Sequence, residues 1–135
     1  MTQVIIFTNA AGGVSVCSPT GAIPIETVLT RDCPAGAIIV DNATLPTGND
    51  AVFFDAWMLN GTTVSVNIVK AQAFYLAQYN AAAIAAAVIR QNNTLTGIPN
   101  AVSDAMWLAN CVTDRAAIAS ATTTAQLLAI NLPTP

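Results

Sequence analysis

Three cysteines and a few aspartates are the side chains in this sequence most suited to chemistry, and histidine is absent. Without histidine there is no Cys-His or Ser-His-Asp arrangement to activate a nucleophile, and no ordinary general base near neutral pH. Cys17, Cys33 and Cys111 are far apart and match no zinc-binding spacing. Residues 1–7 also lack the pattern of a signal peptide. We therefore expect three free, buried thiols, no metal and no cofactor.

Asp41, Asp50 and Asp55 are the candidates for a catalytic carboxylate pair. Each lies in or beside a predicted turn, where an Asp side chain accepts hydrogen bonds from nearby backbone N–H groups. A catalytic pair needs both close geometry and a shifted pKa, whereas a turn needs neither. We therefore interpret these aspartates as turn residues and expect that the protein is not an enzyme.

Low charge is the main feature of the composition. Charged residues make up 8% of the 135 residues and hydrophobic residues 54%, whereas a typical soluble domain has about 25% charged residues. So few charges indicate that much of the surface is covered by a partner or by other copies of the chain. The net charge is −3 and the cations are scattered, which argues against nucleic-acid binding. These cations are Arg31, Lys70, Arg90 and Arg115.

Residues 1–66 have the pattern of short β-strands, because β-branched runs alternate with Gly, Pro, Asn and Asp. A hairpin is predicted around residues 9–13, a short helix over 25–31 and a buried strand over 37–41. The strongest local signal is Asn60-Gly61 between two β-favouring runs. This pair predicts a hairpin with a type I′ turn, in which both central residues have positive φ.

The composition changes at Asn67, and residues 67–135 are expected to be helical. Asn67 can cap a long Ala-rich helix that ends at about residues 91–93, before Gly97 and Pro99. A second helix is expected over residues 100–121, open to interruption near Asn110 and capped by Asn100 or Ser103. A last short helix over 125–130 and a frayed end over 131–135 follow. The prediction is an α+β fold, with a β-rich domain over residues 1–66 and a helical domain over residues 67–135.

The long helix carries two apolar lines rather than one. We expect one line to pack on the second helix through Trp107 and Leu108, and the other to bind another protein; alternatively, both lines are internal to a helical bundle. Cys111, Val112 and Ala116 are expected on the same side of the second helix. Three amides within the long helix oppose membrane insertion. The first line is Phe74, Ala77, Ala81, Ile84 and Val88, and the second line is Tyr75, Tyr79, Ala82, Ala86 and Ile89. The three amides are Gln72, Gln78 and Asn80.

A series of short motifs over about residues 38–91 resembles small proteins encoded beside tail-fibre genes in bacteriophages. In that family a β-rich N-terminal part ends in an aromatic "AW" strand and a hairpin, and a helix with a Lys-Ala start follows. The motifs here are residues 34–36, 38–41, 45–46, 53–57, 60–61 and 66–72.

The resemblance implies a tail-fibre assembly protein, a non-enzymatic chaperone that acts in the host cytoplasm and helps fibre chains to trimerise. The implied partner is a phage tail-fibre protein, in a homo- or hetero-oligomer without nucleic acid or membrane. The alternative is a structural virion component, such as a capsid decoration or baseplate protein. The residues expected to contact the partner are Phe74, Tyr75, Tyr79, Ile84, Val88 and Trp107.

Overall fold

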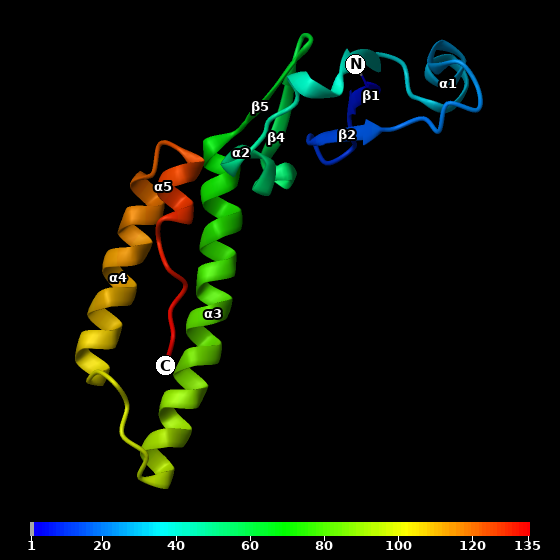
Figure 1. The fold of residues 1–135 in the computed structure, drawn as a ribbon. Coiled ribbons are helices and arrows are strands. Elements are labelled where there is room, and N and C mark those ends of the chain that lie inside the picture. Colours follow the sequence, from blue (N-terminus) through cyan, green and yellow to red (C-terminus); the bar gives the residue numbers. More distant parts are fainter. Residues whose placement is uncertain (1) are drawn as a thin grey trace. The chain divides into compact units, whose positions relative to one another are not determined.

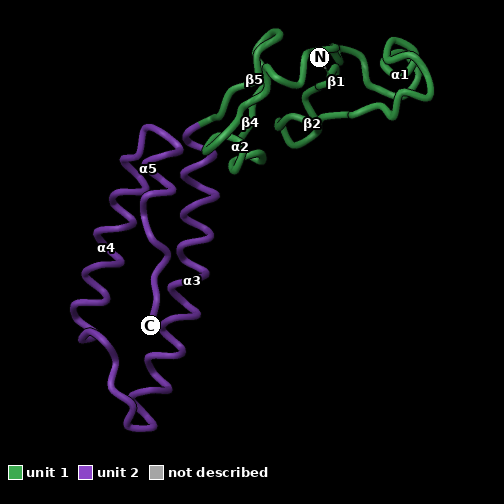
Figure 2. The backbone as a smooth tube through the Cα atoms, in the orientation of Figure 1, with its two compact units in different colours: residues 1–67 green, residues 68–135 purple. Residues whose placement is uncertain are grey.

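The computed structural model describes residues 2–135, and the chain divides between Asn67 and Ile68 into two units, coloured separately in Figure 2. Unit 1 contains the strands and some short helices, and unit 2 is helical. The fold is therefore α+β, as predicted, with β-hairpins in the N-terminal part, a long central helix and a helical C-terminal part. Among the described residues, no helix is both long and apolar enough to cross a membrane.

A three-stranded antiparallel sheet in the order β2-β1-β3 forms the first layer of unit 1 (Figure 1). The β1–β2 hairpin predicted around residues 9–13 is confirmed, with Thr8 paired to Val14. The Asn9 side chain organises its loop, because Oδ1 accepts hydrogen bonds from the N–H groups of Ala11 and Gly13 at 3.1 and 3.0 Å. The strands are β1 (Gln3–Thr8), β2 (Val14–Cys17) and β3 (Ile38–Asp41).

The hairpin predicted at Asn60-Gly61 is present as β4 (Trp57–Asn60) and β5 (Thr63–Val66). Its turn differs from the predicted type I′. Asn60 pairs with Thr63, so Gly61 and Thr62 are the central residues, and only Gly61, at φ 61°, has a positive φ. A β-branched threonine disfavours positive φ, and a turn of type II′ requires it only at the first central position.

The core of unit 1 lies between the sheet and the β4–β5 hairpin. Alternate residues Val4 and Ile6 of β1 point to this side and pack with Val14, Trp57 and Val64. The intervening Ile5 points to the opposite side and is fully buried. On the edge of the unit, α1 (Ile25–Asp32) packs against β1 and β3. Shorter helices are η1 (Asn42–Thr44), α2 (Asn49–Val52) and η2 (Phe54–Ala56).

Unit 2 begins with α3 (Ile68–Thr96), a helix of 29 residues and therefore about 43 Å in length. It continues past the predicted end at residues 91–93. The helix ends where Gly97 adopts φ 75°, and Ile98 N–H donates to the carbonyl of Asn93 at 2.8 Å. This hydrogen bond is that of a Schellman cap, which needs glycine at the left-handed position.

Two further helices, α4 (Asp104–Ser120) and α5 (Thr124–Leu128), pack against α3 and each other. Ser103 caps α4 as predicted, since its Oγ accepts a hydrogen bond from Met106 N–H at 3.2 Å. The helix runs through Asn110 without the possible interruption, and its start falls after residue 100 because the preceding segment is a non-helical connection.

The chain after α5 runs in an extended path between α3 and α4 (Figure 1). We call residues 129–135 the C-terminal segment. The prediction of a frayed end over residues 131–135 is wrong, because side chains of both long helices bind the backbone of this segment.

Candidate interaction surface

The buried face of α3 is one stripe that steps by three and four residues along the helix. Its alanines allow close approach of neighbouring segments, while its longer side chains carry polar tips into the interior of unit 2. Such tips need hydrogen-bond partners there. We call this stripe the inner face; it consists of Ala71, Tyr75, Tyr79, Ala83, Ala86 and Arg90.

Both tyrosine hydroxyls of the inner face donate hydrogen bonds to distant parts of unit 2. Tyr79 donates to Oδ2 of Asp114 on α4 at 2.6 Å, and Tyr75 donates to the backbone carbonyl of Ile130. Burial raises the pKa of both hydroxyls, and for Tyr79 the hydrogen bond to Asp114 raises it further. At neutral pH both tyrosines are therefore neutral hydrogen-bond donors rather than acids or nucleophiles.

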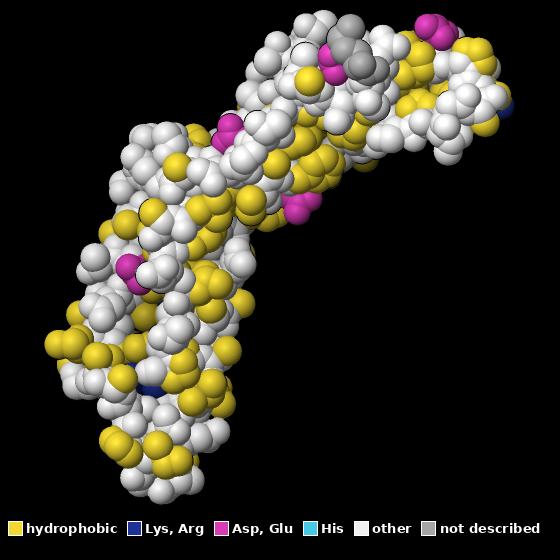
Figure 3. Space-filling view, viewed as in Figure 1, with side chains coloured by type: hydrophobic (Ala, Val, Ile, Leu, Met, Phe, Trp, Pro, Cys, Tyr) yellow, Lys and Arg dark blue, Asp and Glu magenta, His cyan; other side chains and the backbone are white. Residues whose placement is uncertain are grey.

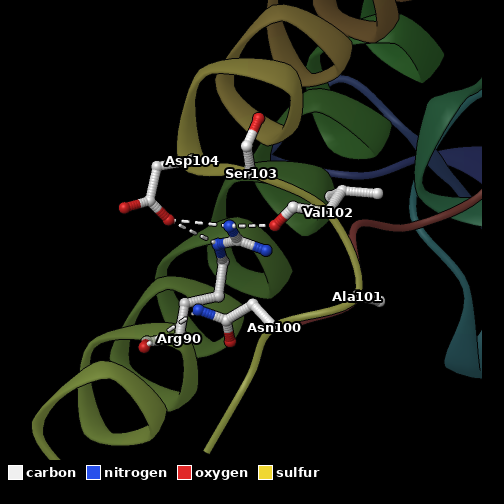
Figure 4. A pocket seen from close by; sticks show the side chains of 6 residues that line it. All are labelled: Arg90, Asn100, Ala101, Val102, Ser103 and Asp104. Carbon is white, nitrogen blue, oxygen red and sulfur yellow. Dashed lines mark hydrogen bonds and ion pairs between the residues drawn. The ribbon is translucent and has the colours of Figure 1, made fainter. Parts of the chain in front are cut away.

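Arg90 lies in a small pocket at the start of α4, where its guanidinium reaches several acceptors (Figure 4). Nη2 donates to Oδ1 of Asp104 at 2.7 Å and to the carbonyl of Val102 at 2.8 Å. Nη1 donates to the carbonyl of Pro135 at 3.1 Å, and the guanidinium carbon lies 5.3 Å from the centre of the Trp107 ring. The cation is thus used to join three parts of unit 2 to one another.

The opposite side of α3 exposes the predicted line that begins at Phe74, while the line that begins at Tyr75 is buried only in part, since Ile89 is 47% exposed. Phe74, Ile84 and Val88 are 48%, 68% and 53% exposed. Residues on this side recur every seven positions, which is the repeat of a coiled-coil seam. The charged residues of α3 are Lys70 and Arg90, so neither lies within the line. We call it the outer face; it consists of Phe74, Ala77, Ala81, Ile84, Val88 and Leu95.

Two residues predicted to contact a partner lie on the wrong side of α3 for that role. Tyr75 and Tyr79 are 6% and 0% exposed, so the expectation that they are available to another protein is wrong in this fold. The reason is that their hydroxyls find acceptors inside unit 2. The other three candidates on α3 are the exposed residues of the outer face. Figure 3 shows hydrophobic side chains spread along unit 2 with few charged ones between them.

Trp107, the last predicted contact residue, is half-buried on α4. Its indole N–H donates to the carbonyl of Thr134 at 2.8 Å, and its ring lies under the Arg90 guanidinium. Trp107 therefore binds the C-terminal segment of its own chain. No pattern in the sequence indicated this role, because the acceptor is a backbone carbonyl.

The second helix also differs from the prediction. Leu108 and Val112 were expected to face α3, but they are 58% and 63% exposed. Cys111, which was expected on the same side, is buried, and so is Ile118, seven residues further along the helix. As a result Leu108 and Val112, four residues apart, give α4 an exposed apolar side of its own, and Met106 is exposed on another side of the helix.

The thiols and Asp41, which the sequence offers as candidates for chemistry, have the following surroundings. All three thiols are free, as predicted, but only Cys111 is buried, whereas Cys17 and Cys33 are half-buried. Burial raises the pKa of the Cys33 thiol, and the neighbouring Cys17 thiol raises it further. Asp41 is a turn residue, since its Oδ1 accepts the Ala43 N–H at 3.0 Å. The described residues contain no cluster of side chains able to hold a metal ion.

The outer face of α3 is thus an exposed apolar surface that extends from Phe74 to Leu95. No protein-family model matches this sequence, and neither a curated protein nor a solved structure is significantly similar to it.

Proposed function

We propose that this protein is a non-catalytic binding protein that covers an apolar surface of another protein chain with the outer face of α3. The observation that carries the proposal is that Phe74, Ile84 and Val88 are exposed on a helix whose uncharged seam continues to Leu95. A lone surface helix normally turns charged and polar residues to water. The span from Phe74 to Leu95 is about 32 Å, which suits a partner helix of about 20 residues.

The partner that agrees with the resemblance is a bacteriophage tail-fibre protein, and the protein is then a fibre-assembly chaperone acting in the host cytoplasm. Fibre chains bury large apolar surfaces only after three copies meet, so an unassembled chain is prone to aggregate. A helper with an apolar helical face binds such a chain and stabilises it until assembly. This role needs neither a metal nor a cofactor.

The exposed apolar side of α4 favours a second candidate, a structural component of the virion. Met106, Leu108 and Val112 are all more than half exposed, so unit 2 has apolar residues on two helices. A permanent place between other subunits covers both sides, whereas a single transient partner helix covers one.

Co-expression with the tail-fibre protein of the same phage tests the proposal. The double variant Ile84→Glu/Val88→Lys places an attractive i,i+4 charge pair on the outer face without changing the net charge. We expect it to bind the fibre protein at least tenfold more weakly and to lower the yield of soluble fibre trimer. The matched control Asn92→Glu/Thr96→Lys places the same pair at exposed polar positions of the same helix and leaves binding unchanged.

Equal binding by both variants excludes the outer face as the contact. Mass spectrometry of purified virions then separates the two candidates, because a chaperone is absent from the finished particle and a structural component is present in many copies.

A further inference from the structure

The C-terminal segment is bound by three side chains that all recognise its backbone. Tyr75 and Arg90 of α3 donate hydrogen bonds to the carbonyls of Ile130 and Pro135. Between them along the segment, the Trp107 indole of α4 donates to the carbonyl of Thr134. We call these three side chains the clamp; the segment that they bind runs between α3 and α4 (Figure 1).

The clamp offers donors and the segment offers acceptors. An indole N–H and a guanidinium can donate but not accept hydrogen bonds. The segment has proline at 133 and 135, which removes two backbone N–H groups and favours an extended chain with outward carbonyls. Because the contacts go to carbonyls, they depend on the conformation of the bound chain more than on its side chains. Aromatic-lined grooves recognise extended proline-containing peptides in this way.

Arg90 and Trp107, two of the three donors of the clamp, also make contacts that do not involve the segment. The Arg90 guanidinium is fixed by Asp104 and Val102 and stacks on Trp107. With the segment in place, Tyr75 and Arg90 are 6% and 4% exposed, so both donors are buried in the occupied clamp. A buried donor without an acceptor is unfavourable, so an empty clamp favours the binding of another carbonyl-rich chain.

We propose that the clamp is a binding site for an extended, proline-containing segment of a different protein, which the C-terminal segment occupies in the isolated protein. This site is separate from the outer face of α3 and does not depend on the function proposed for that face. The attached segment competes at a high effective concentration, so a foreign segment must displace it.

Peptide binding to two variants tests the proposal. The first variant ends at Ile130, and the second keeps the full length but replaces residues 131–135 by Gly and Ser, which form a flexible coil. The probe is a synthetic peptide with the sequence of residues 131–135, the part that both variants lack, titrated by calorimetry into each folded variant and into the unaltered protein. We expect both variants to bind it at least tenfold more tightly than the unaltered protein does.

Two controls make the result specific to the clamp. Adding Trp107→Phe to the Gly/Ser variant removes the donor to Thr134 and weakens peptide binding about fivefold, the usual effect of one lost hydrogen bond. A peptide with both prolines replaced by Gly binds more weakly than the parent, because it has lost the preformed extended conformation.

Three results overturn the proposal. The first is that folded variants fail to bind the peptide at millimolar concentration. The second is that neither variant folds, because the segment is then an inseparable part of unit 2. The third is that the unaltered protein dimerises in sedimentation and both variants are monomers, because the foreign chain is then the segment of a second copy.

Discussion

The two sides of α3 have similar apolar content and opposite surroundings. On the inner face, Tyr79 and Arg90 end in polar groups that have partners on α4 or in the C-terminal segment. On the outer face, Phe74, Ile84 and Val88 have no polar atoms in their side chains and remain exposed. The polar tips of the tyrosines and of Arg90 therefore determine which side of α3 folds inward. A buried hydroxyl or guanidinium requires a specific acceptor, which only the chain's own fold supplies reliably.

The largest difference between the two faces is expected in the free energy of unfolding, when one aromatic ring is removed from each face. Tyr79→Ala leaves a cavity and an unpaired Asp114, and we expect it to lower the free energy of unfolding by about 3–5 kcal/mol. Phe74→Ala, at a half-exposed position, is expected to lower it by less than about 1 kcal/mol. Urea unfolding followed by circular dichroism at the helical band measures both. Equal losses would show that the outer ring is also packed.

Of the two faces of α3, alkaline pH is expected to act on the inner one, because Tyr75 and Tyr79 are the two tyrosines of the chain. In unit 1 the Cys33 thiol, whose pKa is also raised, adds a dependence of the same sign. The pKa values of both tyrosines are raised in the folded state, so the unfolded state releases its protons first, above about pH 10. Their stabilising contribution is therefore complete below that pH and is lost as pH rises toward the folded pKa. The expected loss is up to about 2.7 kcal/mol per pH unit for the two together.

Urea unfolding between pH 8 and pH 11 measures this dependence, and the variant Tyr75→Phe/Tyr79→Phe is its control. In this control the free energy of unfolding is expected to depend much less on pH. Tyrosinate absorbance supplies a second test, since it should appear only as unit 2 unfolds. Ionisation at pH 10 in the folded protein would contradict the buried placement of the hydroxyls.

A smaller effect is expected from the ion pair at the end of the inner face. Asp104→Ala leaves the buried Arg90 guanidinium with carbonyl partners only, and we expect a loss of about 2 kcal/mol. The Asp104 side chain is 74% exposed, which places the loss below that of a fully buried pair. Asp104→Asn keeps one acceptor oxygen and should therefore lower the free energy of unfolding by less than Asp104→Ala does. A larger loss for Asn than for Ala in thermal unfolding would contradict this assignment.

The smallest effect on stability is expected on the outer face. Ile84→Glu/Val88→Lys is expected to change the free energy of unfolding by no more than about 0.5 kcal/mol, because both side chains are already more than half exposed. This variant therefore separates binding from folding. A loss near that of Tyr79→Ala would place Ile84 and Val88 in the core of unit 2.

Local features of the fold were predictable because neighbouring residues determine them. Asn60-Gly61 located the β4–β5 hairpin, and Ser103 located the start of α4. Gly97 indicated a helix stop, although α3 continues to Thr96 because the glycine itself forms the cap. The pair Asn60-Gly61 did not predict which central residue of the turn has a positive φ. Thr62 also constrains the turn, because it occupies the second central position.

The inward line of α3 could not be chosen from periodicity. Tyr75 and Tyr79 lie on a line as apolar as that of Phe74 and Ile84, and the acceptors that fix them are 55 and 35 residues away. The frayed end predicted for residues 131–135 is wrong for a related reason. Its prolines are poor helix formers, which predicts a frayed end, but their carbonyls and those beside them remain available to Trp107 and Arg90.

The clamp also has a consequence for the order of events during protein synthesis. Arg90 and Tyr75 bind carbonyls that are translated 45 and 55 residues later. Unit 1, which ends at Asn67, can complete its own contacts while the ribosome is still producing the helices. Unit 2 cannot close until residue 135 has left the exit tunnel, which takes several seconds at ordinary translation rates. During that interval both sides of α3 are open, so a nascent chain meets its partners or chaperones before its inner face is sealed.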